Sequence, residues 1–173
     1  RSRGLGDVYK RQIERGSKIA FTGANGIGKT TLIKSLLGIV PPLSGKCETG
    51  ENILPGYFEQ EGDYQNKTTC IEEIWQEFPS FNQYEVRSAL AKCGLTTKHI
   101  ESQVRVLSGG EQAKVRLCKI INRETNVLLL DEPTNHLDAD AKDALKKSLQ
   151  EYRGTLLLIC HEPEFYQDVV CLL

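Results

Sequence analysis

The chain has 173 residues, the length of one domain with a sizeable hydrophobic core. Its 22 Lys and Arg residues nearly balance its 23 Asp and Glu residues, which gives no electrostatic reason to expect a nucleic-acid or membrane-surface binder. No apolar run approaches the roughly 20 residues that a membrane span needs, so we expect no direct membrane insertion. Six cysteines are scattered without a CxxC pair, which argues against zinc and a disulfide scaffold and favours reduced thiols in the cytoplasm.

The two ends of the chain differ from the rest. Ser2–Gln12 carries no periodic pattern and matches one reading frame of a common transposase-based sequencing adapter. Cys171–Leu173 matches the same adapter in the opposite orientation. We therefore expect residues 1–12 and 171–173 to be non-native, and the biological sequence to run from about Ile13 to Val170.

The first predicted elements flank a glycine-rich loop. Lys18–Thr22 is a short apolar strand, and a helix is predicted from about Lys29 to Leu37. Gly38 and the pair Pro41-Pro42 prevent this helix from continuing. Ile53–Glu59 has the pattern of a second strand.

Three capping boxes then mark helix starts. In a capping box, an N-cap side chain and a Glu three residues later satisfy each other's free backbone amides. Gly94 is placed to end the second of these helices. The three boxes are Thr69 with Glu72, Asn82 with Glu85, and Ser108 with Glu111.

The last third of the chain alternates strands and a helix. Asn126–Leu130 is a continuous apolar run, typical of a strand buried on both faces. A helix is predicted over about Ala139–Tyr152 and a strand over Thr155–Cys160. The order of elements predicts an α/β fold, a mainly parallel sheet flanked by helices, with an inserted helical subdomain over about residues 66–106.

The glycine-rich loop fits the phosphate-binding pattern GxxxxGK[ST] of P-loop NTPases, between a strand and a helix. Glycines let backbone N–H groups close on phosphate oxygens, and the helix N-terminus adds its positive dipole end. Lys29 would reach the β- and γ-phosphates of ATP, and the Thr30 hydroxyl would ligate Mg²⁺. The alternative is a structural glycine-rich turn. The predicted ATP-binding residues are Gly23, Ala24, Asn25, Gly26, Ile27, Gly28, Lys29, Thr30 and Thr31.

Two carboxylates follow the buried strand before Pro133. Ligands of open α/β sheets gather at the carboxyl ends of strands. Asp131 could then hold Mg²⁺ through water, while Glu132 acts as general base on the attacking water. The alternative is a strand-ending turn with solvated acids.

Further segments resemble the motifs of ATP-binding-cassette (ABC) ATPases. Leu107–Gln112 reads Leu-Ser-Gly-Gly-Glu-Gln and looks like the family's signature motif. Asp131–Asp138 resembles the second acidic motif with the D-loop that follows it. Gln60 stands where the family has its Q-loop glutamine, and His161 matches the switch histidine. These motifs lie in the family's order along nearly the whole chain.

The D-loop sequence Asn135–Asp138 and the segment Glu111–Leu117 are similar to the ABC-F branch, and Glu111-Gln112 looks more like its second cassette than its first. The resemblance implies an Mg²⁺-dependent ATPase with tandem cassettes that acts on ribosomes in translation or antibiotic resistance. It also implies that Ser108, Gly109 and Gly110 contact ATP held by the opposite cassette, that Gln60 takes part in metal binding and catalysis, and that His161 contacts the γ-phosphate. Without the motif order, Ser108 would be only an N-cap and His161 a structural histidine.

The chain departs from the family pattern in three places. It reads Cys160-His161-Glu162-Pro163, where the family usually has Ser-His-Asp-Arg. The early strands, which in the family carry an adenine-stacking aromatic residue, are absent, so we expect this fragment to bind nucleotide poorly. The third departure is that the sequence has no second cassette and no interdomain linker. Two other functions stay open: the nucleotide-binding subunit of an ABC transporter, and a DNA-maintenance ATPase. The latter needs coiled-coil arms, for which Gln60 and Ser108 are too close in sequence.

Overall fold

The computed structural model describes residues 11–58 and 67–170. Its strands are β1 (Lys18–Phe21), β2 (Pro55–Phe58), β3 (Val127–Asp131) and β4 (Thr155–Ile159). Its helices are α1 (Lys29–Leu36), α2 (Cys70–Glu77), α3 (Gln83–Lys92), α4 (Thr97–Glu101), α5 (Gly109–Asn122), α6 (Ala139–Glu151) and α7 (Pro163–Tyr166), with a 3₁₀ turn η1 at Val104–Val106.

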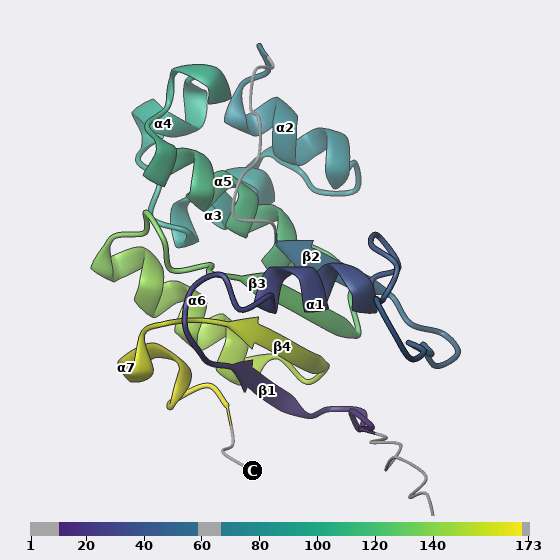
Figure 1. The fold of residues 1–173 in the computed structure, drawn as a ribbon. Helices are drawn as coiled ribbons and strands as arrows, with labels where there is room; N and C mark the ends of the chain where they lie inside the picture. The colour runs from purple at the N-terminus through teal and green to yellow at the C-terminus, as the bar shows by residue number, and fades with distance from the viewer. Residues whose placement is uncertain (1–10, 59–66, 171–173) are drawn as a thin grey trace, which may run out of the picture.

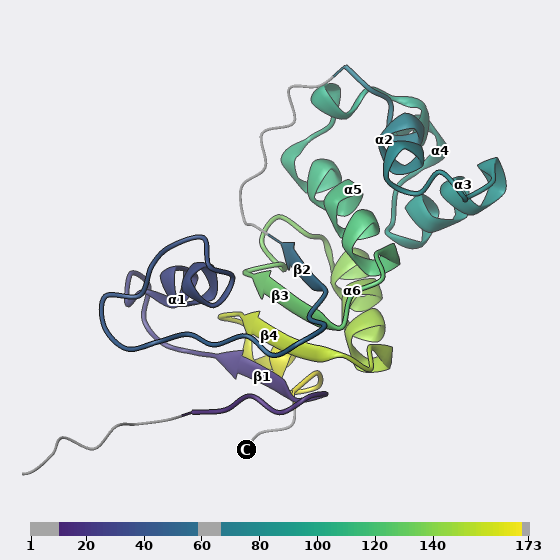
Figure 2. The same ribbon diagram turned by 90° about the vertical axis from the view of Figure 1, so that its right-hand side faces the viewer.

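The four strands form one parallel sheet in the order β1-β4-β3-β2. The predicted α/β fold with a parallel sheet is therefore confirmed. Figures 1 and 2 show α1 on one face of this sheet and α6 on the other, while α2, α3 and α4 group with α5 beyond its β2 edge.

Successive residues of the central strands point to opposite faces of the sheet, which explains their unbroken apolar runs. Leu129 and Leu157 pack with Ile33 of α1 in one core cluster. Leu128, Leu130, Leu156 and Leu158 belong to a second cluster, which extends into the helices on the other side. The two clusters hold the carboxyl ends of β3 and β4 in a fixed register, and these ends carry the candidate catalytic residues.

All three predicted capping boxes are present, at Thr69, Asn82 and Ser108. Gly94 follows the C-cap of α3 with a φ of 81°, as the sequence predicted for the end of that helix. The element boundaries differ from the predicted ones by one or two residues; β3, for example, begins at Val127 and includes Asp131. Helix α4, capped by Thr96, was not predicted, because its single turn carries no periodic pattern.

The cysteines within the described residues are free thiols: Cys47, Cys70, Cys93, Cys118 and Cys160. The same residues contain no cluster of three or more His, Cys, Asp or Glu side chains that could hold a metal ion. Within the described ranges, no helix combines the length and apolar character that crossing a membrane requires.

Candidate functional site

The glycine-rich loop joins β1 to α1 at the carboxyl end of the sheet (Figure 1). Gly28 is the N-cap of α1 and lies in the left-handed region at φ 99° and ψ 18°, which an L side chain would strain. No side chain among the described residues caps this helix, so its first backbone N–H groups are open to an anion there. The loop is largely exposed and therefore accessible to a ligand.

The ammonium group of Lys29 turns back over its own loop. Its Nζ atom donates hydrogen bonds to the carbonyl oxygens of Gly23 at 2.9 Å and Ala24 at 2.8 Å. These contacts place a positive charge beside the open helix start. Thr30 and Thr31 follow in the first turn of α1, and both are exposed.

Asp131 is the last residue of β3 and is only 1% exposed. Its Oδ1 atom is buried and has no hydrogen-bond partner among the described residues. An unpaired buried carboxylate oxygen is costly, and a cation or a bound water would relieve that cost. Asp131 therefore fits the oxygen chemistry of a Mg²⁺ site, which in nucleotide enzymes is completed by phosphate oxygens and water.

Glu132 and His161 lie in direct contact, although 28 intervening residues separate them in sequence. His161 Nε2 is 3.1 Å from Glu132 Oε1, and Asn135 Nδ2 donates to Glu132 Oε2 at 2.6 Å. The sheet explains the contact, because Asp131 pairs with Ile159 and the Glu132 N–H bonds to the Ile159 carbonyl at 2.9 Å. Residues just beyond β3 and β4 are thereby brought side by side.

The backbone of Glu132 has a φ of 47°, which is uncommon for a residue with a side chain. His136, in the same segment, has a φ of 65°. Such conformations persist where surrounding contacts fix them, and they concentrate at functional sites. Here the turn after β3 directs the Glu132 carboxylate toward His161.

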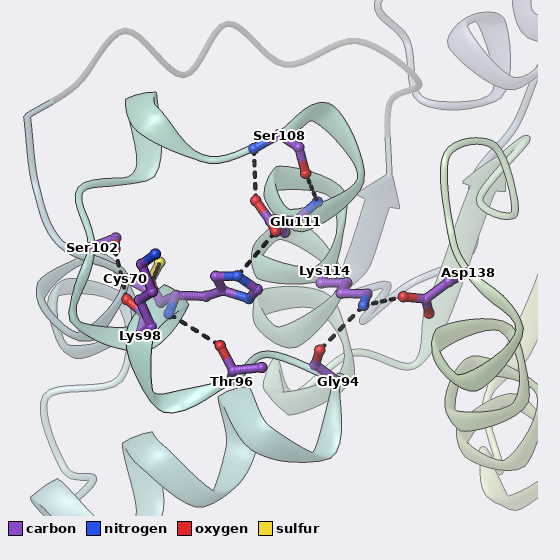
Figure 3. Close-up of polar contacts among 10 residues, drawn as sticks. Cys70, Gly94, Thr96, Lys98, Ser102, Ser108, Glu111, Lys114 and Asp138 are labelled. Atoms are coloured by element: carbon purple, nitrogen blue, oxygen red, sulfur yellow. Dashed lines mark hydrogen bonds and ion pairs between the residues drawn. The ribbon is translucent and has the colours of Figure 1, made fainter.

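The signature segment forms the start of α5. Ser108 is the N-cap, and its N–H donates to Glu111 Oε2 at 2.7 Å while the Glu111 N–H donates to Ser108 Oγ at 3.4 Å (Figure 3). Gly109 and Gly110 are the first two residues of the helix. A Cβ atom on Gly110 would lie 2.6 Å from the His136 carbonyl oxygen, so the segment after Glu132 packs directly on the signature.

The structure thus brings some of the predicted site residues together and leaves others apart. Glu132 and His161 are in contact, next to Asp131. Among the described residues, the phosphate loop and the signature make no hydrogen bond or ion pair with each other. Gln60 lies outside the described residues.

Two polar residues near the signature were not predicted as functional. Lys114 is 7% exposed, and its Nζ atom donates to the Gly94 carbonyl at 3.1 Å and to Asp138 Oδ2 at 2.5 Å. His99 contacts the capping Glu111. A Lys on the buried face of α5, beside Ala113 and Cys118, is a sequence signal that could have identified Lys114.

Comparison with known proteins identifies relatives for most of the chain. The pattern of the ABC transporter family matches residues 7–135. The uncharacterized ABC transporter ATP-binding protein YfmM of Bacillus subtilis is 70% identical over 158 residues, 91% of this chain and 30% of that protein. ABC transporter F family member 2 of Arabidopsis thaliana is 37% identical over 161 residues, 91% of this chain and 24% of that protein.

Among solved structures, one similar chain comes from the complex of the archaeal ribosomal stalk protein aP1 and the archaeal ribosome recycling factor aABCE1. It superposes with a TM-score of 0.78 at 27% identity, over 91% of this chain and 31% of that one. The present chain spans less than a third of each of these three relatives.

Proposed function

Because this chain belongs to the ABC transporter family of ATP-binding domains and has relatives in its F family, we propose that it is one cassette of a ribosome-directed ABC-F ATPase. Membership of the family implies that the domain binds and hydrolyses ATP. The observation that most strongly supports a hydrolytic site is the 3.1 Å contact between Glu132 and His161, next to the buried and unpaired Asp131 Oδ1.

In the proposed site, the amides of residues 23–31 and the Lys29 ammonium bind the ATP phosphates. Lys29 gives up its bonds to Gly23 and Ala24 to do so, an exchange of neutral acceptors for charged ones. The Thr30 hydroxyl, Asp131 and Gln60 would hold Mg²⁺, which when bound neutralises phosphate charge. These residues would position the phosphates and stabilise their negative charge, which is the usual basis of catalysis in phosphoryl transfer.

In the proposed reaction, Glu132 accepts the proton of the attacking water, and His161 holds the Glu132 carboxylate and contacts the γ-phosphate. Both oxygens of Glu132 have a polar neighbour, since His161 Nε2 lies 3.1 Å from Oε1 and Asn135 donates a hydrogen bond to Oε2. A base held in this way does not have to be reoriented during the reaction.

The site would be completed by a second cassette. Ser108, Gly109 and Gly110 form a capped helix start with Ser108 and Gly109 exposed, and helix starts are a type of site that binds anions. Within the part of the chain that the structure describes, they make no hydrogen bond to the phosphate loop. We propose that they bind the γ-phosphate of ATP held by the partner cassette, while the partner's signature completes the present loop. ATP would then close the pair, and hydrolysis would open it.

The ribosomal part of the proposal is supported by the F-family relative and by the similarity to aABCE1, a ribosome recycling factor in complex with a ribosomal stalk protein. The alternative is a transporter subunit, since the structure of an ABC transporter of the metal-chelate type superposes with a TM-score of 0.69 at 25% identity. The complete gene discriminates between them. A second cassette after a charged helical linker supports the first, and a coupled membrane protein supports the second. The same gene shows whether residues 1–12 are native.

Co-sedimentation with ribosomes tests the proposal directly. The full-length protein with Glu132→Gln should sediment with ribosomes in ATP and be released in ADP. If the protein does not sediment with ribosomes in either ATP or ADP, and fractionates with a membrane complex instead, the ribosomal role is refuted.

A further inference from the structure

We propose that His99, on helix α4, is a positioning residue that holds Glu111 against the start of α5 and so orients Ser108 for its nucleotide. The proposal rests on the proposed function of the signature segment and adds a residue outside its motifs. His99 does not touch the nucleotide in this account, because it acts through Glu111.

The two carboxylate oxygens of Glu111 have separate partners. Oε2 accepts from the Ser108 N–H at 2.7 Å, which closes the capping box shown in Figure 3. Oε1 lies 3.1 Å from His99 Nε2. One oxygen therefore fixes the helix start, and the other ties it to the group of helices α2–α4.

The backbone of His99 is held by neighbouring residues. Its backbone N–H donates to Thr96 Oγ1 at 3.4 Å, and its carbonyl accepts from Cys70 Sγ at 3.2 Å and from the Ser102 N–H at 3.1 Å. Its Nδ1 atom is buried and has no hydrogen-bond partner within the described residues. Nε2 is therefore the nitrogen that must carry the proton, because an ionised carboxylate only accepts hydrogen bonds.

The hydrogen bonds of the capping box favour the ionised form of Glu111. The Ser108 backbone N–H and then the Ser108 side chain lower the pKa of Glu111. The carboxylate is about one-quarter exposed, so water competes for it. Without the second anchor, the long Glu side chain would turn toward solvent more often, and the Ser108 amide and hydroxyl would lose their common orientation.

Steady-state ATP hydrolysis by the full-length protein tests this role. The Ser108 contact is made in the closed ground state and persists in the transition state, so its loss affects binding more than chemistry. We expect His99→Ala to raise the apparent KM for ATP about threefold to tenfold and to change kcat less than about twofold.

Two conservative variants separate the polar contact of Nε2 from the bulk of the ring. The amide nitrogen of Gln reaches about as far as Nε2, so His99→Gln should restore most of the KM. The amide of Asn ends near the position of Nδ1, so His99→Asn should behave as His99→Ala does. If the Gln and Asn variants have the same KM, the proposal is wrong, even where the Ala variant fails to fold.

Arg87 provides a matched control on the same group of helices. Its guanidinium bonds Glu101 of α4 at 3.0 Å, on an exposed surface without contact to Glu111. Arg87→Ala should leave the KM for ATP within about twofold of the wild-type value. It should change the urea midpoint as much as His99→Ala does. Equal KM changes in the two variants would show a general loosening of α4 and overturn the proposal.

The route through Glu111 is tested by the double variant. In a Glu111→Ala background, His99→Ala should have no further effect on KM, and fully additive changes contradict the proposal. Ser108→Arg distinguishes this inference from the proposed function. If it leaves turnover intact, the signature assignment itself fails. If it abolishes turnover while His99→Ala has normal kinetics, only the His99 inference fails.

Discussion

The Lys114 ammonium lies 2.5 Å from the Asp138 carboxylate, and this pair joins the signature helix α5 to the segment that follows Glu132 (Figure 3). Lys114 also donates to the Gly94 carbonyl at the end of α3, so one side chain connects three parts of the fold. Asp138 uses its other oxygen to cap α6, accepting from the Ala141 N–H at 2.9 Å. A movement of the helices α2–α4 would thus be transmitted to the residues beside Glu132.

Replacement of Lys114 by Met keeps the length of the side chain and removes both polar contacts. We expect a loss of about 1–2 kcal/mol in the free energy of unfolding, because the Gly94 carbonyl and Asp138 lose a charged donor. Urea denaturation of the full-length wild-type and Lys114→Met proteins measures this loss. An unchanged midpoint would show that the pair contributes nothing to stability.

The free energy of unfolding should fall more on Asp138→Ala than on Asp138→Asn. Asp138→Asn keeps an N-cap acceptor but loses the charge and the oxygen that accepts from Lys114, whereas Asp138→Ala loses the cap as well, at about 1 kcal/mol more. Urea denaturation of both variants compares them directly. Equal destabilisation by the two substitutions would contradict the capping role.

Gly110 and Gly109 form a matched pair for a packing test. A Cβ on Gly110 would meet the His136 carbonyl oxygen at 2.6 Å, whereas one on Gly109 has no neighbour within 4 Å. Gly110→Ala should therefore destabilise the protein by about 1–3 kcal/mol. Gly109→Ala should stabilise it by up to about 1 kcal/mol through helix propensity. Thermal unfolding of the two variants checks both signs, and a stable Gly110→Ala protein would refute the close approach.

Glu111 gives a pH dependence with a defined sign. The hydrogen bonds from Ser108 lower the pKa of Glu111 in the folded state, so the ionised form contributes stability above the unfolded value of about 4.3. That contribution is lost as the pH falls through the lower folded value. The stability difference between wild type and Glu111→Gln should therefore be constant near neutral pH and shrink below about pH 4. A difference that grows on acidification would contradict the capping geometry.

The fold was predictable where the signals were local. Capping boxes act over four residues, and all three appear at the expected positions. Unbroken apolar runs identified β3 and β4, and the position of Asp131 and Glu132 followed from the end of that run. The strand order was not predictable, because it depends on how helices pack across the sheet. For the same reason the sequence did not indicate the contacts of His99 with Glu111 or of Lys114 with Gly94, which join segments 12 and 20 residues apart through tertiary structure.

ATP turnover by the full-length Glu132→Gln protein tests the central claim most directly. The substitution keeps the shape of the side chain and removes the base that we assign to the attacking water. We expect kcat to fall by about 100-fold or more, with ATP retained on the protein after removal of free nucleotide. Glu162→Gln is the control. It makes the same chemical change one residue after His161, at a carboxylate that pairs with Lys142. Retained ATP and lost turnover in the first variant alone would support the assignment, and normal turnover by Glu132→Gln would contradict it.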